Sequence, residues 1–408
     1  MKKFHFLALL LLPISVFAKS YLISNVPLPN IKVLNLDPKP CNTECLEKYL
    51  KDGFIFSFLA YTDSKLEDSQ LEKAKEEYWA IFNGKKIKPQ DKIRIALLLP
   101  YKKIARYATS TTNASFAYLI SKGYPFELKS FKIEDEGQKE ISNALKKIQD
   151  EGFKYVIAPL TKDGEQVVSK IDPDINIFFP TINKKDTQSN SKFLYYGGID
   201  YSAQSDMLIE KSASPLVIFH DESDIGKQLS SYQEQIYRTK FLESKNPAVI
   251  KYTIPQRITN LEDKLKDNRR INGSSVFINT PIIKSGMVLS QLTLFDVNPA
   301  NILSTQTNYN PLLLSMTQYR DRKNMIIANS ITNNNDELIE INSFLSNDIV
   351  YDWINYTTTI GVDYFSNLIS QEKREYVIDI QNNQMIYPIV LVKPSESKFI
   401  PYESSSEE

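Results

Sequence analysis

Residues 93–100 have the sequence IRIALLLP, an apolar run that ends in proline and precedes a segment with helical spacing. The same unit recurs along the chain as far as Ile331, and each copy closes with proline or a small polar residue. The further copies are YVIAPLT (155–161), NIFFPTIN (176–183), SPLVIFHD (214–221), SSVFINT (274–280) and NMIIANS (324–330). Short apolar runs that alternate with helices are typical of strands buried on both faces of a parallel sheet. The sequence therefore predicts an α/β fold.

The units fall into two series. The first covers residues 91–200, with strands expected at 93–99, 126–133, 155–160 and 177–181 and from Phe193 onward, and helices at 104–121 and 138–150. The second covers residues 201–335 and begins with the strand VIFHD. Two sheets of about five strands each are nearer the usual size than one large sheet, which is the alternative. We therefore predict two parallel-sheet lobes, with ligand groups at the carboxyl ends of their strands.

The first 18 residues have the features of a secretory signal peptide. Lys2 and Lys3 provide a basic start, residues 7–17 are mostly apolar, and Val16-Phe17-Ala18 resembles a small-residue cleavage site. The apolar segment is too short to span a membrane, and no longer one follows. The residue directly after the cleavage site is Lys19 and not Cys, so we expect a soluble periplasmic protein without a lipid anchor and without a transmembrane segment in the mature chain.

Residues 19–90 differ in composition from the series that follows. A proline-containing extended lead precedes CLEKYLKDGFIFSFLA and SQLEKAKEEYWAIFNG, which we predict to form two helices in a hairpin. The chain contains two cysteines, Cys41 and Cys45. In an oxidising compartment they can close a small loop that contributes about 2 kcal/mol. A redox-active pair is the alternative, although C-x-x-C is the usual spacing for it, so we favour a structural disulfide.

The C-terminal part contains a long helical run at 336–369 and then EYVIDIQNNQMIYPIVLV, which predicts a β-hairpin around Asn382-Asn383. We assign residues 336–395 to lobe 1 together with residues 91–200. The polar, acidic segment 396–408 is predicted to be disordered.

Charge and motif content exclude several classes of function. Lys plus Arg and Asp plus Glu each total 49, which argues against binding to nucleic acid. His220 is the only histidine after the predicted cleavage site, and neighbours on one strand, such as His220, Asp221 and Ser223, rarely adopt triad geometry. No G-x-S-x-G, H-E-x-x-H or phosphate-binding glycine loop occurs. We expect no enzymatic activity, no cofactor and no metal site.

Several of these segments resemble the type I periplasmic binding fold of branched-chain amino-acid receptors. The similar segments are FLYYGGIDYSAQSDMLIEK, PLVIFHDESDIGKQL and SSVFINTPIIKSGMVLSQLTLFDVNPANILS, in the order expected for that family. Within the superfamily, ALLLP, VIAPLT and VFINTPIIKSGMVLSQL resemble a divergent branch that contains activators of penicillin-binding proteins. Members of that branch place a helical domain before the binding-like domain and use the fold to contact a protein partner.

The resemblance to transport receptors implies candidate ligand positions in an inter-lobe cleft. Those receptors hold a ligand carboxylate with hydroxyls and backbone N–H groups at strand ends, which correspond to Thr161, Thr181 and Asn183 here. Thr161 can equally cap the helix that starts at Lys162. Two expected contacts are missing, because Ile225 occupies the place of a ligand-binding Tyr and ILSTQTNYN offers no carboxylate for an amino group.

Further polar residues follow predicted strands and complete the set of candidate ligand residues. In STQTNYNP, Tyr309 could cover a ligand beside Asn308, but the segment can also be a turn that starts the next helix. Tyr101, Asp221 and Thr280 occupy equivalent strand-end positions.

Two functional hypotheses remain from the sequence. The first is a non-enzymatic periplasmic binding or scaffold protein that acts through an envelope protein partner. The alternative is a solute receptor of a transporter for an amino acid or another small polar ligand.

Overall fold

The computed structural model describes residues 33–37, 39–62, 64–82, 92–241, 248–257 and 260–402. The predicted signal peptide, residues 1–18, lies outside the described residues. The chain divides into two compact units, residues 1–89 and 90–408. In the described part of the chain, no helix is long and apolar enough to cross a membrane.

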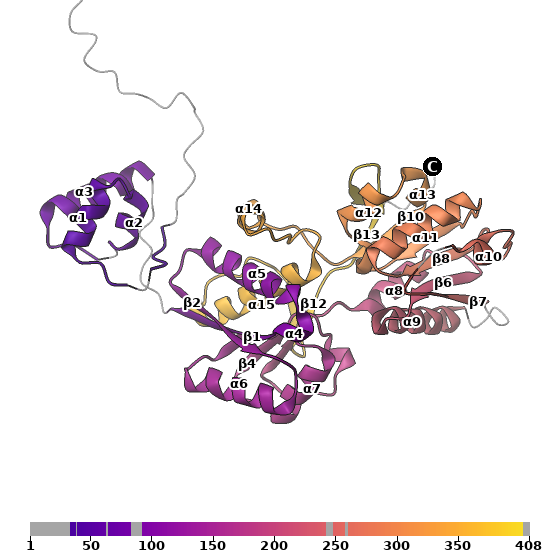
Figure 1. Ribbon diagram of the computed structural model, residues 1–408, viewed down its shortest axis with the longest axis horizontal. Coiled ribbons are helices and arrows are strands. Elements are labelled where there is room, and N and C mark those ends of the chain that lie inside the picture. Colours follow the sequence, from indigo (N-terminus) through magenta and orange to yellow (C-terminus); the bar gives the residue numbers. More distant parts are fainter. Residues whose placement is uncertain are drawn as a thin grey trace, which may run out of the picture. The chain divides into compact units, whose positions relative to one another are not determined.

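The N-terminal unit contains three helices in its described residues, coloured indigo in Figure 1. They are α1 (Thr43–Lys51), α2 (Ile55–Ala60) and α3 (Ser69–Phe82). The prediction of one helix from CLEKYLKDGFIFSFLA is wrong, because Gly53 takes a φ of +78° and ends the first helix. The unit has its own apolar core, formed by Leu46, Phe58, Leu59 and Leu71.

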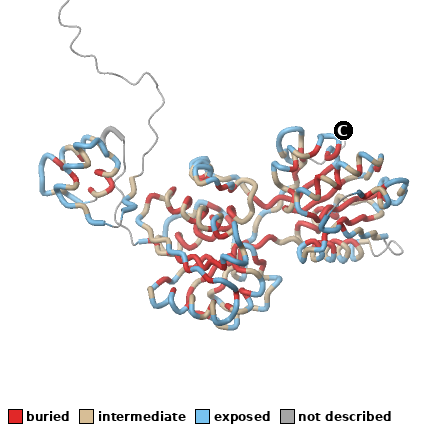
Figure 2. Tube along the Cα trace, viewed as in Figure 1, coloured by how far each residue is buried: buried red, intermediate tan, exposed pale blue. Residues whose placement is uncertain are grey.

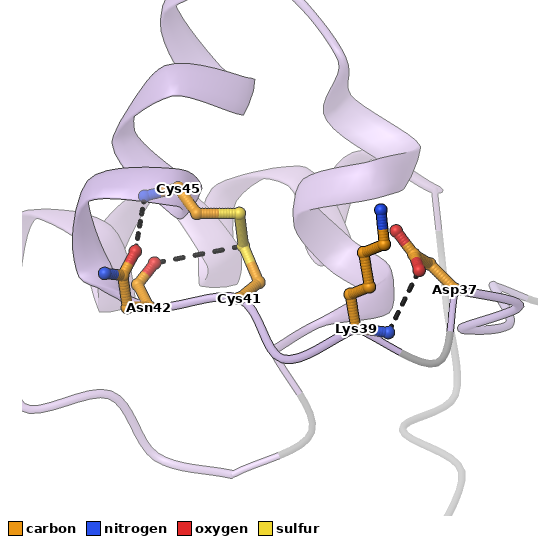
Figure 3. The surroundings of a disulfide bond; sticks show 5 residues. All are labelled: Asp37, Lys39, Cys41, Asn42 and Cys45. Atoms are coloured by element: carbon orange, nitrogen blue, oxygen red, sulfur yellow. Dashed lines mark hydrogen bonds between the residues drawn. A yellow bond between two sulfur atoms is a disulfide. The ribbon is translucent and has the colours of Figure 1, made fainter.

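A disulfide joins Cys41 to Cys45 at the start of α1, with a Cα–Cα distance of 5.4 Å (Figure 3). Between them, Asn42 is the N-cap residue of α1, and its side-chain oxygen accepts a hydrogen bond from the Cys45 backbone N–H at 3.0 Å. The disulfide and the cap therefore fix the same helical turn. Nearby, Asp37 Oδ1 accepts a hydrogen bond from the Lys39 backbone N–H at 3.0 Å.

Lobe 1 of the C-terminal unit is built on a seven-stranded sheet of order β11-β12-β5-β4-β3-β1-β2. Its strands are β1 (Ile93–Pro100), β2 (Phe126–Ile133), β3 (Tyr155–Ile157), β4 (Asn176–Phe179), β5 (Leu194–Tyr196), β11 (Asp379–Gln381) and β12 (Gln384–Ile386). In this spatial order, every neighbouring pair of strands is parallel except the pair β11–β12, which is antiparallel.

Strand β1 explains why the opening apolar run has no polar face. Its side chains alternate between two cores, with Ile95 and Leu97 in one and Ala96 and Leu98 in the other. Helices cover both faces of the sheet, so both sets of side chains are buried (Figures 1 and 2). These helices are α4 (Tyr101–Ile104), α5 (Arg106–Lys122), α6 (Gln138–Asp150), α7 (Lys162–Ile171), α14 (Asp336–Phe344) and α15 (Trp353–Ser370).

Lobe 2 has a second seven-stranded sheet, of order β14-β13-β10-β9-β8-β6-β7. Its strands are β6 (Leu216–Asp221), β7 (Val249–Ile254), β8 (Ser275–Asn279), β9 (Asn301–Ser304), β10 (Met325–Asn329), β13 (Val390–Pro394) and β14 (Phe399–Pro401). Its helices are α8 (Tyr201–Ile209), α9 (Asp224–Lys240), α10 (Glu262–Leu265), α11 (Ile282–Leu294), α12 (Pro311–Met316) and α13 (Tyr319–Arg322). Short 3-10 turns cover Lys184–Asp186 in lobe 1 and Gln306–Asn308 in lobe 2.

The C-terminal segment differs in part from the prediction. The β11–β12 hairpin is confirmed, with Asn382 and Asn383 both at positive φ in its turn. Assignment of residues 390–395 to lobe 1 is wrong, because the apolar strand β13 pairs antiparallel with β10 of lobe 2. Disorder from residue 396 is also wrong for β14, which pairs with β13; residues 403–408 lie outside the described residues. The buried Arg322 guanidinium fixes the intervening turn by donating to the backbone oxygens of Ser395 and Glu396.

Candidate functional site

At the start of α7, both hydrogen-bond donors of Thr161 are directed at a carboxylate of the chain itself. The Thr161 backbone N–H donates to Glu136 Oε1 at 2.7 Å, and the Thr161 hydroxyl donates to Glu136 Oε2. Thr161 is the N-cap residue of α7, but its side chain makes no capping hydrogen bond. Glu136 therefore occupies the two donors that the receptor resemblance assigns to a ligand carboxylate, and the capping alternative does not hold either.

Glu136 reaches this position because a glycine leaves room for it. A Cβ atom at Gly164 would lie 2.9 Å from the carboxyl carbon of Glu136, which is closer than real Cβ contacts. Only 8% of the Glu136 side chain is exposed. Burial of a carboxylate is costly unless hydrogen bonds compensate it, and the two Thr161 donors provide them. The contact is therefore an integral part of lobe 1.

The other lobe 1 candidates are Asn183, Thr181 and Tyr101. Asn183 is buried, donates through Nδ2 to the Gly198 backbone oxygen at 3.1 Å, and accepts from the Lys185 backbone N–H at 3.0 Å. These bonds tie the segment after β4 to the segment after β5. Thr181 is exposed, and Tyr101 lies with its ring under the Lys132 ammonium, 4.8 Å from the ring centroid. Asn183 thus stabilises the fold of the strand ends.

In lobe 2, Asp221 stabilises the start of α9. Its Oδ1 atom accepts from the backbone N–H and the hydroxyl of Ser223, and Ser223 in turn caps α9 at the Gly226 N–H. Asp221 Oδ2 also lies 3.7 Å from Lys284 Nζ. His220 Nδ1 contacts the Asp221 backbone oxygen at 2.8 Å, so its contact is with the main chain and the carboxylate is engaged by Ser223. This geometry does not form a catalytic triad.

Thr280 and Asn308 are buried and bonded within lobe 2. The Thr280 and Ser285 hydroxyls lie 2.8 Å apart at the start of α11. Asn308 Nδ2 donates to the Ser304 hydroxyl at 2.7 Å and to the Ile278 backbone oxygen at 3.3 Å. Asn308 Oδ1 has no hydrogen-bond partner among the described residues. The two side chains therefore mainly link strand ends to the following turns.

Tyr309 belongs to an aromatic cluster. Its ring centroid lies 4.7 Å from that of Phe399 in β14 and 5.2 Å from that of Tyr351, which precedes α15. Burial, reinforced by Tyr351, raises the pKa of Tyr309 to about 12. The cluster joins the loop after β9 to the C-terminal strand and to the segment before α15.

The lobes are also connected by polar contacts that the sequence analysis did not predict. Asp186 Oδ1, at the end of the lobe 1 turn, accepts from Gln228 Nε2 and from the Tyr232 hydroxyl of α9, both at 3.0 Å. Asp186 Oδ2 pairs with Lys162 Nζ at 3.3 Å. Asp186 and Glu136 each lie three residues beyond a predicted strand segment (176–183 and 126–133), so a search of the immediate strand ends misses both. Their only sequence signal is an acidic residue in a polar turn.

Three cavities of the described chain lie away from all eight predicted ligand residues. One of about 660 Å³ lies beside α7, one of about 250 Å³ adjoins the end of α11, and one of about 440 Å³ lies in the N-terminal unit. Within the described residues, no group of three or more His, Cys, Asp or Glu side chains could hold a metal ion. The predicted strand-end residues therefore do not converge on any of these cavities.

Neither a family model nor a curated protein sequence matches the chain. Solved structures match at low sequence identity. A leucine-binding protein from Thermotoga maritima is 14% identical, with a TM-score of 0.55 over 76% of this chain and 98% of that chain. LivJ from Streptococcus pneumoniae, solved with isoleucine, is 11% identical, with a TM-score of 0.55 over 76% of this chain and 98% of that chain. These likenesses confirm the predicted two-lobed type I periplasmic binding fold.

LpoA from Haemophilus influenzae matches more of the chain. It is 12% identical, with a TM-score of 0.51 over 89% of this chain and 72% of that chain. Residues 90–408 make up 319 of the 408 residues, about 78%, so a match over 89% includes part of the N-terminal unit. Its C-terminal domain alone, described as a regulator of PBP1A, matches 76% of this chain with 10% identity and a TM-score of 0.51.

Proposed function

We propose that this protein is a non-enzymatic periplasmic binding protein that acts through a protein partner at the cell envelope. The observation that carries the proposal is the Glu136–Thr161 contact. A ligand carboxylate at Thr161 would have to displace Glu136 from two charge-assisted hydrogen bonds, which costs roughly 1.5–3 kcal/mol for each bond. The strand-end position that recognises an amino acid in a transport receptor is thus occupied by the Glu136 carboxylate of the chain itself.

The likeness to LpoA supports a protein partner of the penicillin-binding type. That likeness extends into the N-terminal helical unit, whereas the matches to the two transport receptors cover 76% of the chain. A helical unit placed before a type I binding fold is the arrangement that the resemblance to penicillin-binding-protein activators implies.

The exposed face of α11 offers a suitable contact surface. Ile283 and Leu294 are 59% and 69% exposed, and their spacing of 11 residues places them on one face of the helix, with Met287 between them. Lys284 is the single charged residue of this helix. Exposed apolar residues that share a face are typical of protein–protein contact sites.

Binding to purified ectodomains of bifunctional penicillin-binding proteins from the same organism tests the proposal. Biolayer interferometry should show saturable binding to one of them. Ile283→Asp combined with Leu294→Asp should weaken it at least about tenfold, since a charge at a buried interface position remains unpaired. Phe344→Asp is the control, because Phe344 is an even more exposed apolar residue, on α14 in lobe 1. If no ectodomain binds, the proposal fails.

The alternative function is a solute receptor, which is favoured by neighbours solved with isoleucine or 3,4-dihydroxybenzoic acid. A ligand that binds the folded protein raises its melting temperature. A screen of amino acids, short peptides and aromatic acids separates the two functions. We expect no shift at millimolar concentrations, and a saturable shift would favour the receptor.

Export through residues 1–18 is part of the proposal. Cell fractionation followed by mass spectrometry of the mature N-terminus should find the protein in the periplasm, beginning at Lys19. An uncleaved cytoplasmic form would contradict it.

A further inference from the structure

The cavity of about 660 Å³ beside α7 has walls of polar and charged side chains. It lies between α7 and the turn that follows β4, and its volume is within the range of small-molecule pockets. The charged residues in its wall are Glu165, Lys170, Asp172 and Asp186, so acids outnumber bases. Asp186 is already paired with Lys162 and bonded to α9. Glu165 and Asp172 therefore remain as the acids available to a ligand.

Glu165 is the feature that points to a ligand. Only 2% of it is exposed, and its Oε1 atom accepts from the Ser169 hydroxyl at 2.6 Å and from the Tyr196 hydroxyl at 2.8 Å. Burial raises the pKa of Tyr196 to about 12, so this hydroxyl remains a donor. Glu165 Oε2 has no hydrogen-bond donor among the described residues, and no Lys or Arg of that part of the chain forms an ion pair with Glu165.

A buried carboxylate without a cationic partner is energetically unfavourable. Glu165 lies in the first turn of α7, where the helix dipole stabilises an acid but offsets only part of that cost. Glu165 lines the cavity, so a cationic group of a ligand in the cavity can approach its carboxylate.

The spacing of the two available acids suggests an elongated cation. Glu165 and Asp172 are seven residues apart, which corresponds to about two helical turns and a rise of about 10 Å along α7. Two carboxylates at that separation cannot share one metal ion, in agreement with the lack of a metal-ligand cluster among the described residues. Two ammonium groups on one linear chain can span them, and the hydroxyl and amide groups of the wall can accept the remaining N–H donors.

We propose that the cavity beside α7 binds a linear polyamine, with one ammonium group on Glu165 and a second near Asp172. The site is independent of the partner surface on α11 and of the Thr161 position. It gives the chain a small-molecule site outside the strand-end region.

Isothermal titration of the full-length mature protein with spermidine at about 150 mM salt tests this site. Saturable one-to-one binding is expected. Glu165→Gln should weaken binding at least about tenfold, because the amide keeps the oxygen that Ser169 and Tyr196 contact but removes the charge. Asp172→Asn should weaken it less, and hexylamine, which has a single ammonium group, should bind more weakly than spermidine.

Asp163→Asn is the matched control, since Asp163 is an exposed acid in the same helical turn and is not part of the cavity wall. It should change the affinity less than about twofold. Lack of spermidine binding to the native protein overturns the proposal. Equal losses in the Asp163 and Glu165 variants also overturn it, because they would indicate unspecific attraction to an acidic surface. Circular dichroism confirms that each variant is folded.

Discussion

Glu136 and Glu165 are both buried acids beside the first turn of α7, but their surroundings differ. Both oxygens of Glu136 accept hydrogen bonds from Thr161, whereas one oxygen of Glu165 has no donor among the described residues and Glu165 lines a cavity. In the first region the chain supplies its own carboxylate to the position where a receptor would hold a ligand. In the second region it leaves a carboxylate without a partner. The position that the fold suggests for a ligand is therefore closed, and an unexpected one is open.

Removal of the Glu136 side chain should have the largest effect on this comparison. Glu136→Ala breaks two charge-assisted hydrogen bonds and leaves the half-buried donors of Thr161 without their acceptor, so we expect the free energy of unfolding to fall by about 2–4 kcal/mol. Urea denaturation followed by circular dichroism measures the change. Glu134→Ala, an exposed acid two residues away, is the control and should change stability little.

The same variant can be tested by chemical rescue. Acetate has the size of the fragment that is missing beyond Cβ and can restore the contact, so millimolar acetate should raise the melting temperature of Glu136→Ala and leave the native protein unchanged. If the variant is as stable as the native protein, or if acetate stabilises both equally, Thr161 is not a carboxylate site.

Asp186 links the α7 cavity to lobe 2, because it lines the cavity and also contacts α9 of lobe 2. Asp186→Ala removes acceptors for Gln228 and Tyr232 and the ion-pair partner of Lys162. We expect a loss of about 1–2 kcal/mol and a larger radius of gyration in small-angle X-ray scattering, because the lobes lose a polar connection. Asp174→Ala removes a bond to Gln149 within lobe 1 and is the control. An unchanged radius would mean that other contacts determine the lobe arrangement.

The sequence predicted the fold well because strand burial is encoded locally. Runs such as 93–100 are apolar at nearly every position when helices cover both faces of a sheet, and this pattern does not depend on distant residues. Strand β14 was missed because its two large apolar residues, Phe399 and Ile400, directly follow the polar residues 395–398. Its pairing partner is β13, a strand of the lobe 2 sheet.

The candidate site was predicted less well, because it depends on contacts between residues far apart in sequence. Glu136 and Thr161 are separated by 25 residues, and the acid lies in a turn that carries no motif. Tyr309 was expected to face a ligand, but its environment is set by Phe399 and Tyr351, which are distant in sequence. The pattern placed Thr161 after a strand, but it did not identify Glu136 as the hydrogen-bond partner of Thr161.

Glu165→Gln should have a smaller effect on stability, with the opposite sign to that of Glu136→Ala. The substitution removes an unpaired buried charge but retains an acceptor for Ser169 and Tyr196, so the ligand-free protein should gain about 1 kcal/mol. Asp163→Asn loses the same interaction with the helix dipole and serves as the reference. Thermal unfolding without polyamine measures both. A clear loss of stability in Glu165→Gln relative to Asp163→Asn would mean that the carboxylate already has a partner in the folded protein.

Asp352 is a partly buried acid that can be compared with these two, and its effect should be the smallest. Burial raises the pKa of Asp352, although the backbone N–H groups of Ile354 and Asn355 that it caps at the start of α15 act in the opposite direction. Because the folded-state pKa lies above the unfolded value, the folded protein binds the proton more tightly. That contribution to stability is present below the ordinary Asp pKa and is lost as the pH rises through the raised value.

Asp352→Asn keeps the cap and does not titrate. The native protein should therefore gain stability relative to Asp352→Asn as the pH falls through the raised pKa toward about 3.9, as measured by urea unfolding of both proteins at a series of pH values. A relative loss over that range would mean that the two N–H donors outweigh burial, and Asp352 would then resemble Glu136 more than Glu165.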